Sequence, residues 1–300
     1  MWNKCALAIV FLVSTAYAED SLRVDVETLA DKKLDGRAPG TEGDKTTRAY
    51  IVDRFKALKL APAFGDSYEQ PFKTKDATTA NVAAVIRGSD ANVGDEIILV
   101  SSHHDHLGDG HLGANDNASG VAAMLGIAKS LADTKPRRTI VFVAFGSEET
   151  GMNGSYFYAA HAPDDLPTDK IVQVINLDMV GTHKEAGFVA AMGTFPKLAA
   201  TPVLAKLEKS YPKLNVGMGG KARGSDFEPF CTQGTPYVFF WTPDKRCYHE
   251  RCDTPDKVDY AGMADITALA GDLTTAMADS TADLAAAKAK YGCFGKATRH

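Results

Sequence analysis

The sequence predicts an α/β sandwich built around a largely parallel or mixed sheet, and three observations support this prediction. Short apolar runs alternate along the chain with longer segments whose apolar residues recur at helical spacing. The runs over 140–145 and 171–177 are apolar almost throughout, as expected for strands that are buried on both faces. Several runs end abruptly at His, Asp or Glu, and the functional sites of open α/β sheets lie just beyond the carboxyl ends of the strands.

The first elements expected along the chain are one helix and two strands. Residues 43–60 are predicted to form an amphipathic helix, because Ile51 and Phe55 recur at helical spacing with other apolar residues. Short apolar runs at 81–86 and 97–100 are bounded by Gly, Asp and Asn, which is typical of strands.

Strands and helices are expected to alternate through the rest of the chain. A helix is predicted to begin at Asn117, with Val121 and Leu125 on one face, and the last helix is rich in Ala, with Met263 and Ile266 facing inward. The elements predicted for this part of the chain are a helix from Asn117, strands at 140–145 and 171–177, a helix at 196–211, a strand at 236–241 and a helix at 258–289.

The first eighteen residues are expected to be a signal peptide. Lys4 gives a positively charged start, Ala6 to Val13 form a short apolar core, and Ala16-Tyr17-Ala18 is the small-x-small pattern found before a cleavage site. The apolar stretch is too short to span a bilayer as a retained helix, although an uncleaved anchor is the alternative. The protein is therefore expected to be exported to the periplasm or the medium, without membrane attachment after cleavage.

The remaining residues, 19–300, are expected to form one domain. They contain no long linker, low-complexity tract or internal repeat, and their number is at the upper end of what one core organises. The net charge of −5 is made of mixed signs without a basic stripe, so nucleic-acid binding is not expected.

Four cysteines follow the predicted signal peptide, which itself contains Cys5. An even number of cysteines in an exported chain indicates disulfides. Cys247 and Cys252 are close in sequence, which favours their pairing and leaves Cys231 with Cys293. A thiolate zinc site is the alternative, but it would require tighter paired spacing than these cysteines have.

A cluster of histidines follows the second predicted strand. His103 and Asp105 are two residues apart, so their side chains can lie on one side of the strand end, where a carboxylate would orient a metal-binding imidazole. His104, His106 and His111 are further candidates in the same stretch. His104 and His106 would open a metallo-β-lactamase-like signature, but that signature needs an Asp at position 108 and a His at position 109. The chain has Gly and Asp there, which excludes this interpretation.

Four acidic residues follow strands or precede a helix. Asp116 would either cap the helix or bridge two metal ions. Glu148 and Glu149 follow a buried strand with no basic neighbour, so they are either solvated or a metal ligand beside a general base. Asp178 lies between apolar residues at a strand end, where it is either buried with a partner or bound to metal.

The charges of these residues are consistent with a site for two metal ions. Two divalent cations bring +4, and Asp116, Glu149 and Asp178 bring −3, with neutral histidines. The residual positive charge would hold a water and lower its pKa. Nitrogen and carboxylate donors without thiolates suit zinc, and would also accommodate manganese or cobalt. His249 is the second imidazole of this set.

The motifs, taken in order, resemble those of the secreted bacterial two-zinc aminopeptidases, which are zinc exopeptidases of the leucyl-aminopeptidase type. The resemblance covers nearly the whole chain after the predicted signal peptide. It rests on Leu34-Asp35-Gly36-Arg37-Ala38-Pro39-Gly40-Thr41, Ser102-His103-His104-Asp105-His106-Leu107-Gly108, Asn115-Asp116-Asn117-Ala118-Ser119-Gly120, Ser147-Glu148-Glu149 with Gly154-Ser155, Asn176-Leu177-Asp178-Met179, and Tyr248-His249 with Asp253-Thr254.

The resemblance implies a fold and a metal site. The fold is a three-layer sandwich in which helices flank a central mixed, mostly parallel sheet, and the short stretch between the strands at 81–86 and 97–100 leaves no room for a protease-associated insert. Two Zn²⁺ are implied for each chain. Position by position, His103 and Asp178 would hold one zinc, Glu149 and His249 would hold the other, and Asp116 would bridge them.

The resemblance also implies a reaction, the release of N-terminal residues from peptides that have a free N-terminus. Glu148 would be the general base, taking a proton from a water and passing it to the leaving amine. Asp105 would orient His103, and Tyr248 would donate a hydrogen bond to the tetrahedral oxyanion. Some members have a disulfide that matches Cys247–Cys252, which would stiffen the loop carrying Tyr248.

Three positions depart from the family pattern. Phe227 follows Ser225-Asp226 where a His is common, so any role of that His is absent or is supplied by another residue. His104 stands in place of a frequent Tyr, and Asn115 replaces a usual Asp, which removes one negative charge near the site.

Other functions are compatible with parts of this pattern. A glutaminyl-cyclase-like acyl transferase with one zinc, a dipeptidase and a carboxypeptidase would share the fold. A non-catalytic binding protein on the same scaffold would be expected to lack ligands or the base, which are all present here. Aromatic residues over 227–241 are expected to belong mostly to the core, with some lining a pocket for the terminal side chain.

Overall fold

The computed structural model describes residues 19–288 and Cys293, so the predicted signal peptide lies outside the described residues. Within them, nine strands form one mixed sheet in the order β1-β3-β5-β4-β6-β9-β7-β8, with β2 paired to β3. The strands are β1 (Ala61–Pro62), β2 (Glu69–Lys73), β3 (Thr78–Ile86), β4 (Ile97–His103), β5 (Thr139–Phe145), β6 (Ile171–Leu177), β7 (Val189–Met192), β8 (Val216–Met218) and β9 (Tyr237–Trp241).

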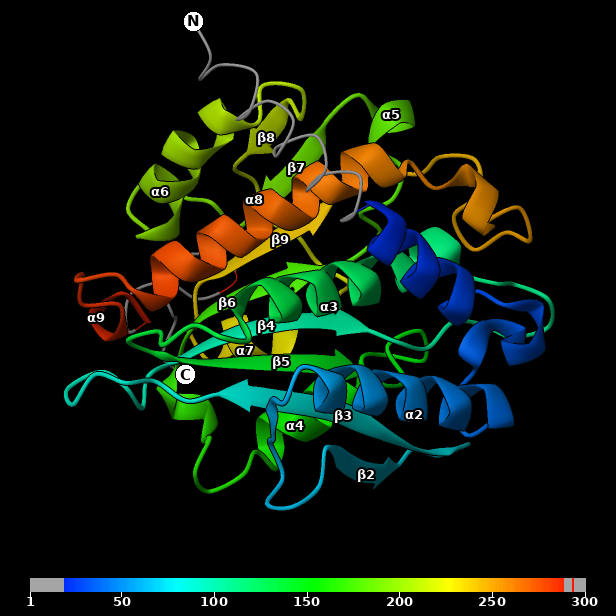
Figure 1. Ribbon diagram of the computed structural model, residues 1–300, viewed down its shortest axis with the longest axis horizontal. Helices are drawn as coiled ribbons and strands as arrows, with labels where there is room; N and C mark the ends of the chain where they lie inside the picture. The colour runs from blue at the N-terminus through cyan, green and yellow to red at the C-terminus, as the bar shows by residue number, and fades with distance from the viewer. Residues whose placement is uncertain (1–18, 289–292, 294–300) are drawn as a thin grey trace, which may run out of the picture.

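Helices cover both faces of this sheet (Figure 1). A helix over 19–29 begins the described part of the chain. The α-helices that follow are α2 (Glu42–Ala57), α3 (Gly120–Leu131), α4 (Asn153–Ala160), α5 (His183–Ala186), α6 (Ala200–Leu207), α7 (Glu228–Thr232), α8 (Tyr260–Ala278) and α9 (Ala285–Lys288). Short helical turns lie at η1 (Lys32–Arg37), η2 (Ala114–Ser119), η3 (Thr168–Lys170), η4 (Glu208–Ser210) and η5 (Pro255–Lys257).

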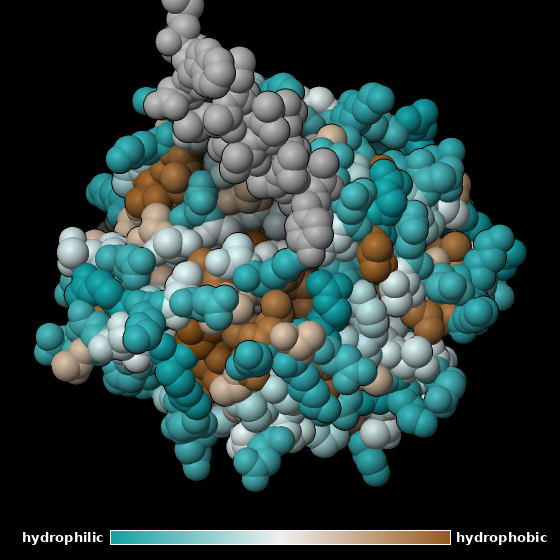
Figure 2. Space-filling view, in the orientation of Figure 1, coloured by the Kyte–Doolittle hydropathy of each residue, from teal (hydrophilic) through white to brown (hydrophobic). Residues whose placement is uncertain are grey.

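The core lies in two layers, one on each side of the sheet. Alternate residues of a strand point to opposite faces, so Ile140 and Phe142 of β5 belong to the cluster that includes residues of α2, α3, α6 and α8, whereas Val141 and Val143 belong to the cluster that includes residues of α4 and α7. On the face that carries α2, α3 and α8, hydrophilic side chains predominate at the periphery, and hydrophobic ones gather toward the middle (Figure 2). The predicted three-layer α/β sandwich with a mixed sheet is confirmed.

The central strands are parallel and place their carboxyl ends together. β4 pairs in parallel with β5 on one side and with β6 on the other, and β6 pairs in parallel with β9. The antiparallel pairs, β1–β3, β2–β3, β3–β5 and β7–β9, lie toward the two edges. Since the chain leaves β4 and returns first on one side and then on the other, β4 is the switch point, beyond whose carboxyl end a site is expected.

Several of the predicted helices have different limits in the structure. The helix expected from Asn117 begins at Gly120, because Asp116 and Asn117 have non-helical backbone angles and the side-chain oxygen of Asn117 accepts from the Gly120 amide. The helix expected over 196–211 is reduced to α6 and η4.

The helix expected over 258–289 is interrupted after α8, and residue 289 lies outside the described part. Beyond Ala278, the guanidinium of Arg138 donates to the carbonyls of Ser280 and Ala282. The interruption falls at Asp279-Ser280-Thr281, residues with a lower helix propensity than Ala, and the carbonyls of Ser280 and Ala282 are directed to a neighbouring segment. The helix over 19–29 and strands β1, β2, β7 and β8 were not predicted. Among the described residues, no helix is both long and apolar enough to cross a membrane.

Candidate metal centre

The predicted site residues meet at the carboxyl ends of the central strands. His103 is the last residue of β4, Asp178 directly follows β6, and Glu148 and Glu149 lie in the loop after β5. Asp116 lies in η2, and His249 comes from a loop after β9. All six side chains line one pocket of about 420 Å³.

Asp116 lies between the two histidines. Its Oδ1 is 3.3 Å from Nε2 of His103, and its Oδ2 is 3.2 Å from Nε2 of His249. His103 Nε2 is also 3.4 Å from Oδ1 of Asp178, and His249 Nε2 is 3.0 Å from Oε2 of Glu149. The five residues therefore form two sets of three donors, which share the carboxylate of Asp116.

These distances fit two metal ions. Two ligands bound at 2.0–2.1 Å with tetrahedral angles lie about 3.3 Å from one another. Each histidine nitrogen lies 3.0–3.4 Å from two carboxylate oxygens, one of them from Asp116. The donor set contains only imidazole nitrogens and carboxylate oxygens, which suits zinc. The assignment of these residues as ligands remains a prediction.

Asp178 and Glu149 each turn their second oxygen to a buried side chain. Oδ2 of Asp178 accepts a hydrogen bond of 2.7 Å from the Ser225 hydroxyl, which in turn accepts from Asn176. Oε1 of Glu149 lies 2.6 Å from Nδ1 of His106, a fully buried histidine. Each of the two carboxylates thus presents one oxygen to the donor set.

Two buried aspartates hold the backbone of the ligand loops. The carboxylate of Asp105 accepts hydrogen bonds from the amides of Glu148 and Glu149, at 3.0 and 3.3 Å. The carboxylate of Asp253 accepts from the amides of Asn115 and Asp116, at 2.7 and 2.9 Å. Both aspartates therefore position a ligand loop through its main chain.

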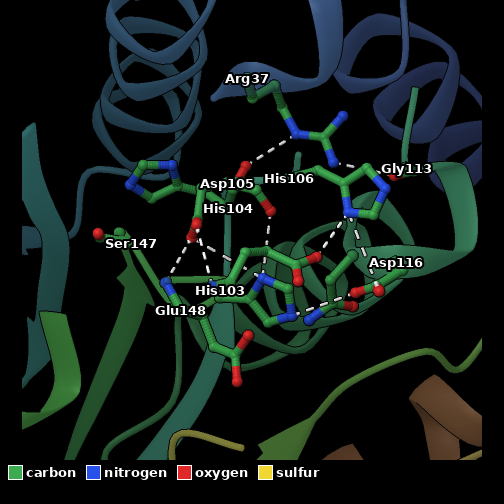
Figure 3. A network of polar contacts seen from close by, with 12 residues as sticks. Arg37, His103, His104, Asp105, His106, Gly113, Asp116, Ser147 and Glu148 are labelled. Carbon is green, nitrogen blue, oxygen red and sulfur yellow. Dashed lines mark hydrogen bonds and ion pairs between the residues drawn. The ribbon is translucent and has the colours of Figure 1, made fainter. Parts of the chain in front are cut away.

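The expected contact of Asp105 with His103 differs in detail from the prediction. His103 Nδ1 is 3.2 Å from the main-chain carbonyl of Asp105 and 3.9 Å from its carboxylate (Figure 3). The carbonyl is thus the hydrogen-bond partner of the imidazole, because the carboxylate is occupied by the two amides of the loop after β5.

Arg37 connects the segment after β4, which contains His104, to the segment before η2, which contains Leu112 and Gly113. Its buried guanidinium donates to the carbonyls of Leu29, His104, Leu112 and Gly113, at 2.7–2.9 Å. Figure 3 shows the contacts with His104 and Gly113. His104 O follows His103 directly, and Gly113 O precedes Asp116 by three residues, so one side chain ties together the segments that carry two predicted ligands. Burial lowers the pKa of Arg37 to about 10, against the raising effect of Asp253 and other nearby carboxylates.

The protonation equilibria at the site reflect burial and the close histidine–carboxylate pairs. Burial is the main cause that raises the pKa of Glu148 to about 10; the charge of His103 opposes this shift, and the charges of Asp226, Asp178 and Asp105 contribute to it. Burial alone would raise the pKa of Asp116, but hydrogen bonds from His103 and His249 hold it well below its usual range. The contacts with Asp116 and Glu149 raise the pKa of His249 to about 10.

Tyr248 and His249 lie on a loop that is closed by a disulfide. Cys247 and Cys252 are bonded, with 5.3 Å between their Cα atoms, and Cys231 is bonded to Cys293, so both predicted pairings are present. The Tyr248 ring stacks on His249 with 3.9 Å between ring centroids, and 52% of the residue is exposed. Burial of its hydroxyl end and the nearby carboxylates raise the pKa of Tyr248 to about 12, so it keeps its proton at neutral pH.

The departures from the family pattern lie outside the donor set. His104 is turned away toward the carbonyl of Ala80, 3.1 Å from its Nε2. The side-chain oxygen of Asn115 accepts from the Gly181 amide, so this residue braces the segment after Asp178. Phe227 stacks on Tyr237 in the core, with 4.2 Å between ring centroids.

Sequence reasoning gave no role to four residues that contact the site. Asp253 was part of a quoted motif, and His106 belonged to the histidine cluster, so both carried a signal. Arg37 and Ser225 also lay in motifs, but an isolated Arg or Ser does not reveal its partners before the fold brings them together.

Comparisons with known proteins place these motifs in a family. Residues 81–274 match the model of peptidase family M28. Leupeptin-inactivating enzyme 1 of Streptomyces exfoliatus is 27% identical over 251 residues, which cover 76% of this chain and 54% of that protein. An aminopeptidase of Pseudomonas aeruginosa is 28% identical over 207 residues, covering 60% of this chain and 38% of that protein. The chain thus spans about half or less of the length of these curated relatives.

Solved structures show the same fold. The aminopeptidase from Aneurinibacillus sp. strain AM-1 is 30% identical with a TM-score of 0.59, covering 69% of this chain and 50% of that chain. A zinc aminopeptidase from Bacillus subtilis has a TM-score of 0.74 at 16% identity and covers 89% of this chain and 97% of that chain. At that identity the second likeness concerns the fold alone.

Proposed function

This chain belongs to peptidase family M28, and from this premise we propose that it is a zinc-dependent aminopeptidase that releases N-terminal residues from peptides. The family expected from the sequence motifs is thereby confirmed. The observation that carries the proposal is the carboxylate of Asp116 between two histidines, each of which also faces one further carboxylate. Relatives named as aminopeptidases support the same activity.

We infer two zinc ions for each chain. His103 and Asp178 would hold one, Glu149 and His249 the other, and Asp116 would contact both. When bound, zinc supplies a Lewis acid that polarises a carbonyl and lowers the pKa of a water. The two complete donor sets favour this assignment over the single zinc expected of a glutaminyl-cyclase-like enzyme.

Glu148 is the proposed general base. It lines the pocket beside the donor set, and its backbone amide is fixed by Asp105, so the position of its main chain is determined. Its carboxylate would accept a proton from the attacking water and deliver it to the leaving amine. Burial disfavours the charged form of Glu148, and nearby cations would oppose this effect because they stabilise the carboxylate.

Tyr248 is the proposed hydrogen-bond donor to the oxyanion. It lines the pocket next to His249, and its raised pKa of about 12 keeps the hydroxyl protonated and able to donate. Its position on the exposed loop leaves room for a peptide to approach.

The pocket is suited to an apolar terminal residue. Of the aromatic residues considered in the sequence, Phe239 and Trp241 line the pocket, whereas Phe227, Phe230 and Phe240 are buried in the core. Met179 and Met192 also line the pocket. Aminoacyl substrates such as leucyl derivatives are therefore the first to test.

The proposal is tested with a panel of leucyl substrates, in free and N-acetylated form, together with a glutaminyl peptide, with and without a chelator. We expect hydrolysis of the free substrates only, loss of activity with the chelator, and recovery on addition of Zn²⁺. Cleavage of the blocked substrates would indicate a different exopeptidase, cyclisation of the glutaminyl peptide would indicate an acyl transferase, and activity after complete removal of metal would refute the mechanism.

The role of Glu148 is tested by Glu148→Gln. The amide cannot accept the proton, so kcat should fall by roughly 10²–10⁴-fold while zinc content is unchanged. Glu250→Gln is the matched control, because Glu250 is exposed and only one residue beyond His249. Near-normal turnover by Glu148→Gln would contradict the assigned role.

A further inference from the structure

Glu149 has two oxygens with different surroundings. Oε2 lies 3.0 Å from His249 Nε2, within the donor set, whereas Oε1 lies 2.6 Å from His106 Nδ1. His106 is fully buried, and its contact with the carboxylate is the shortest among the histidine–carboxylate pairs of the site. The protein itself therefore holds one oxygen of Glu149, without any bound metal.

The local backbone is built to accept His106 at this place. Gly113 has a φ of +62°, and a Cβ there would lie 2.6 Å from Cγ of His106 and 2.2 Å from the carbonyl of Asp116. Glycine is therefore required for the chain to pass between the imidazole and the turn that carries Asp116. Arg37 fixes the same point, because its guanidinium donates to the carbonyl of Gly113.

The opposite side of the site repeats this arrangement with another residue type. Oδ2 of Asp178 accepts from the Ser225 hydroxyl, and Oδ1 faces His103. Each outer carboxylate thus has one oxygen held by a buried side chain and one oxygen left for the donor set, whereas both oxygens of Asp116 face histidines.

We propose that His106 is a positioning residue for Glu149, which it restricts to a single ligand oxygen, Oε2, directed toward His249. The inference rests on the proposed zinc site. It adds His106 to the proposed ligands and the proposed general base. Held in this way, the carboxylate loses less rotational freedom when it binds a metal, which favours binding.

The geometry distinguishes this role from that of a ligand. A carboxylate oxygen only accepts hydrogen bonds, so Nδ1 of His106 carries the hydrogen and has no lone pair to offer a metal. The contact with Glu149 is made by Nδ1, and Nε2, the other ring nitrogen, is buried without a hydrogen-bond partner among the described residues. Nδ1 is also 3.9 Å from the nearer oxygen of Asp116, too far for a hydrogen bond.

The test is a zinc titration of the protein after removal of metal, by calorimetry or by competition with a chromophoric chelator. His106→Leu removes the donor, and we expect the affinity of one zinc to fall about 10- to 100-fold while the second is nearly unchanged. His106→Asn keeps a donor, since its amide nitrogen can take the place of Nδ1, and should recover most of that affinity. Saturating zinc should restore the activity of both variants to within a few-fold of the original.

His104→Asn is the matched control, because His104 is equally buried and two residues away but contacts the carbonyl of Ala80. It should leave both zinc affinities unchanged. Loss of one whole equivalent of zinc in both His106 variants would make His106 a ligand and overturn the proposal, as would unchanged affinity in His106→Leu. Zinc binding without peptidase activity in the unmodified protein would count against the proposed function and leave this comparison intact.

Discussion

His103 and Asp178 lie on the buried side of the candidate site, whereas His249 lies on its open side. His103 is 1% exposed at the end of β4, and Asp178 follows β6 in the middle of the sheet. The side chain of His249 is 35% exposed on the loop closed by Cys247–Cys252. Both histidines make the same kind of contact with Asp116, so the two sides present similar donors from very different surroundings.

The two sides also differ in what holds them, and an arginine on each side illustrates this. Arg37 is fully buried and donates to four backbone carbonyls, among them those of His104 and Gly113 in the segments that carry the proposed ligands His103 and Asp116. Arg251 leaves 66% of its side chain exposed and makes a 3.0 Å ion pair with Asp109, which connects the disulfide loop to the loop after β4. We therefore expect the buried side to depend on the fold as a whole, and the open side to depend on local cross-links.

The largest effect is expected from Arg37→Met. Loss of the guanidinium leaves four buried carbonyls without their donor, and such hydrogen bonds are worth about 1–3 kcal/mol each, so the free energy of unfolding should fall by about 4 kcal/mol or more. Denaturant unfolding measures this change.

Arg37→Lys is the informative companion variant, because it keeps the charge but cannot reach four carbonyls at once. It should be intermediate in stability and should bind zinc more weakly than the original protein. A stable Arg37→Met variant with unchanged zinc affinity would show that the buried side does not depend on this residue.

Intermediate effects are expected from removal of each disulfide. One removal should lower mainly the free energy of unfolding, and the other should also lower zinc affinity. Replacing Cys231 and Cys293 by Ser opens a loop between residues 62 apart and should cost about 4 kcal/mol of stability, since the constraint on the unfolded chain grows with loop length. Replacing Cys247 and Cys252 opens a loop between residues only 5 apart and should cost about 2 kcal/mol.

Zinc affinity should respond in the opposite order. The loop at 247–252 carries His249, and ordering it again on binding should weaken one zinc by about tenfold, which corresponds to about 1.4 kcal/mol. The Cys231–Cys293 bridge lies at α7, away from the donor set, so its loss should leave zinc affinity unchanged in the folded protein. Equal zinc affinities in the two double variants would remove the distinction between the two sides.

The proposed ligands at strand ends are the part of the site that the sequence predicts most directly. A mostly apolar run that ends shortly before His103 or Asp178 indicates both a buried strand and its end, so the position of each side chain beyond that end could be predicted from the local pattern. Asp116 was expected at the start of a helix, but η2 is not regular there, because Asn117 uses its side chain to accept from the Gly120 and Met179 amides.

The residues that hold the segments of the proposed ligands could not be given their roles from local pattern. Arg37 is separated by 67 residues from the His104 carbonyl, and Asp253 by 137 residues from the Asp116 amide, so their partners exist only once the sheet is assembled. A charged residue in a polar stretch is also usually exposed, which made a buried arginine unexpected. The interruption after α8 combines a local and a long-range cause, since Asp279-Ser280-Thr281 have low helix propensity and Arg138 contacts the carbonyls of Ser280 and Ala282.

The smallest effect is expected from Arg251→Ala on the open side. Exposed ion pairs contribute about 0–1 kcal/mol, so the free energy of unfolding should change by less than about 1 kcal/mol, and the change should shrink at high salt. Asp109→Asn removes the same ion pair from the other loop, and the double variant should therefore cost no more than either single one. The measurement is denaturant unfolding at low and high salt, set beside Arg37→Met. If Arg251→Ala were as costly as Arg37→Met, or if its cost did not depend on salt, the open side would be held by more than local cross-links, because an exposed ion pair alone cannot supply that energy.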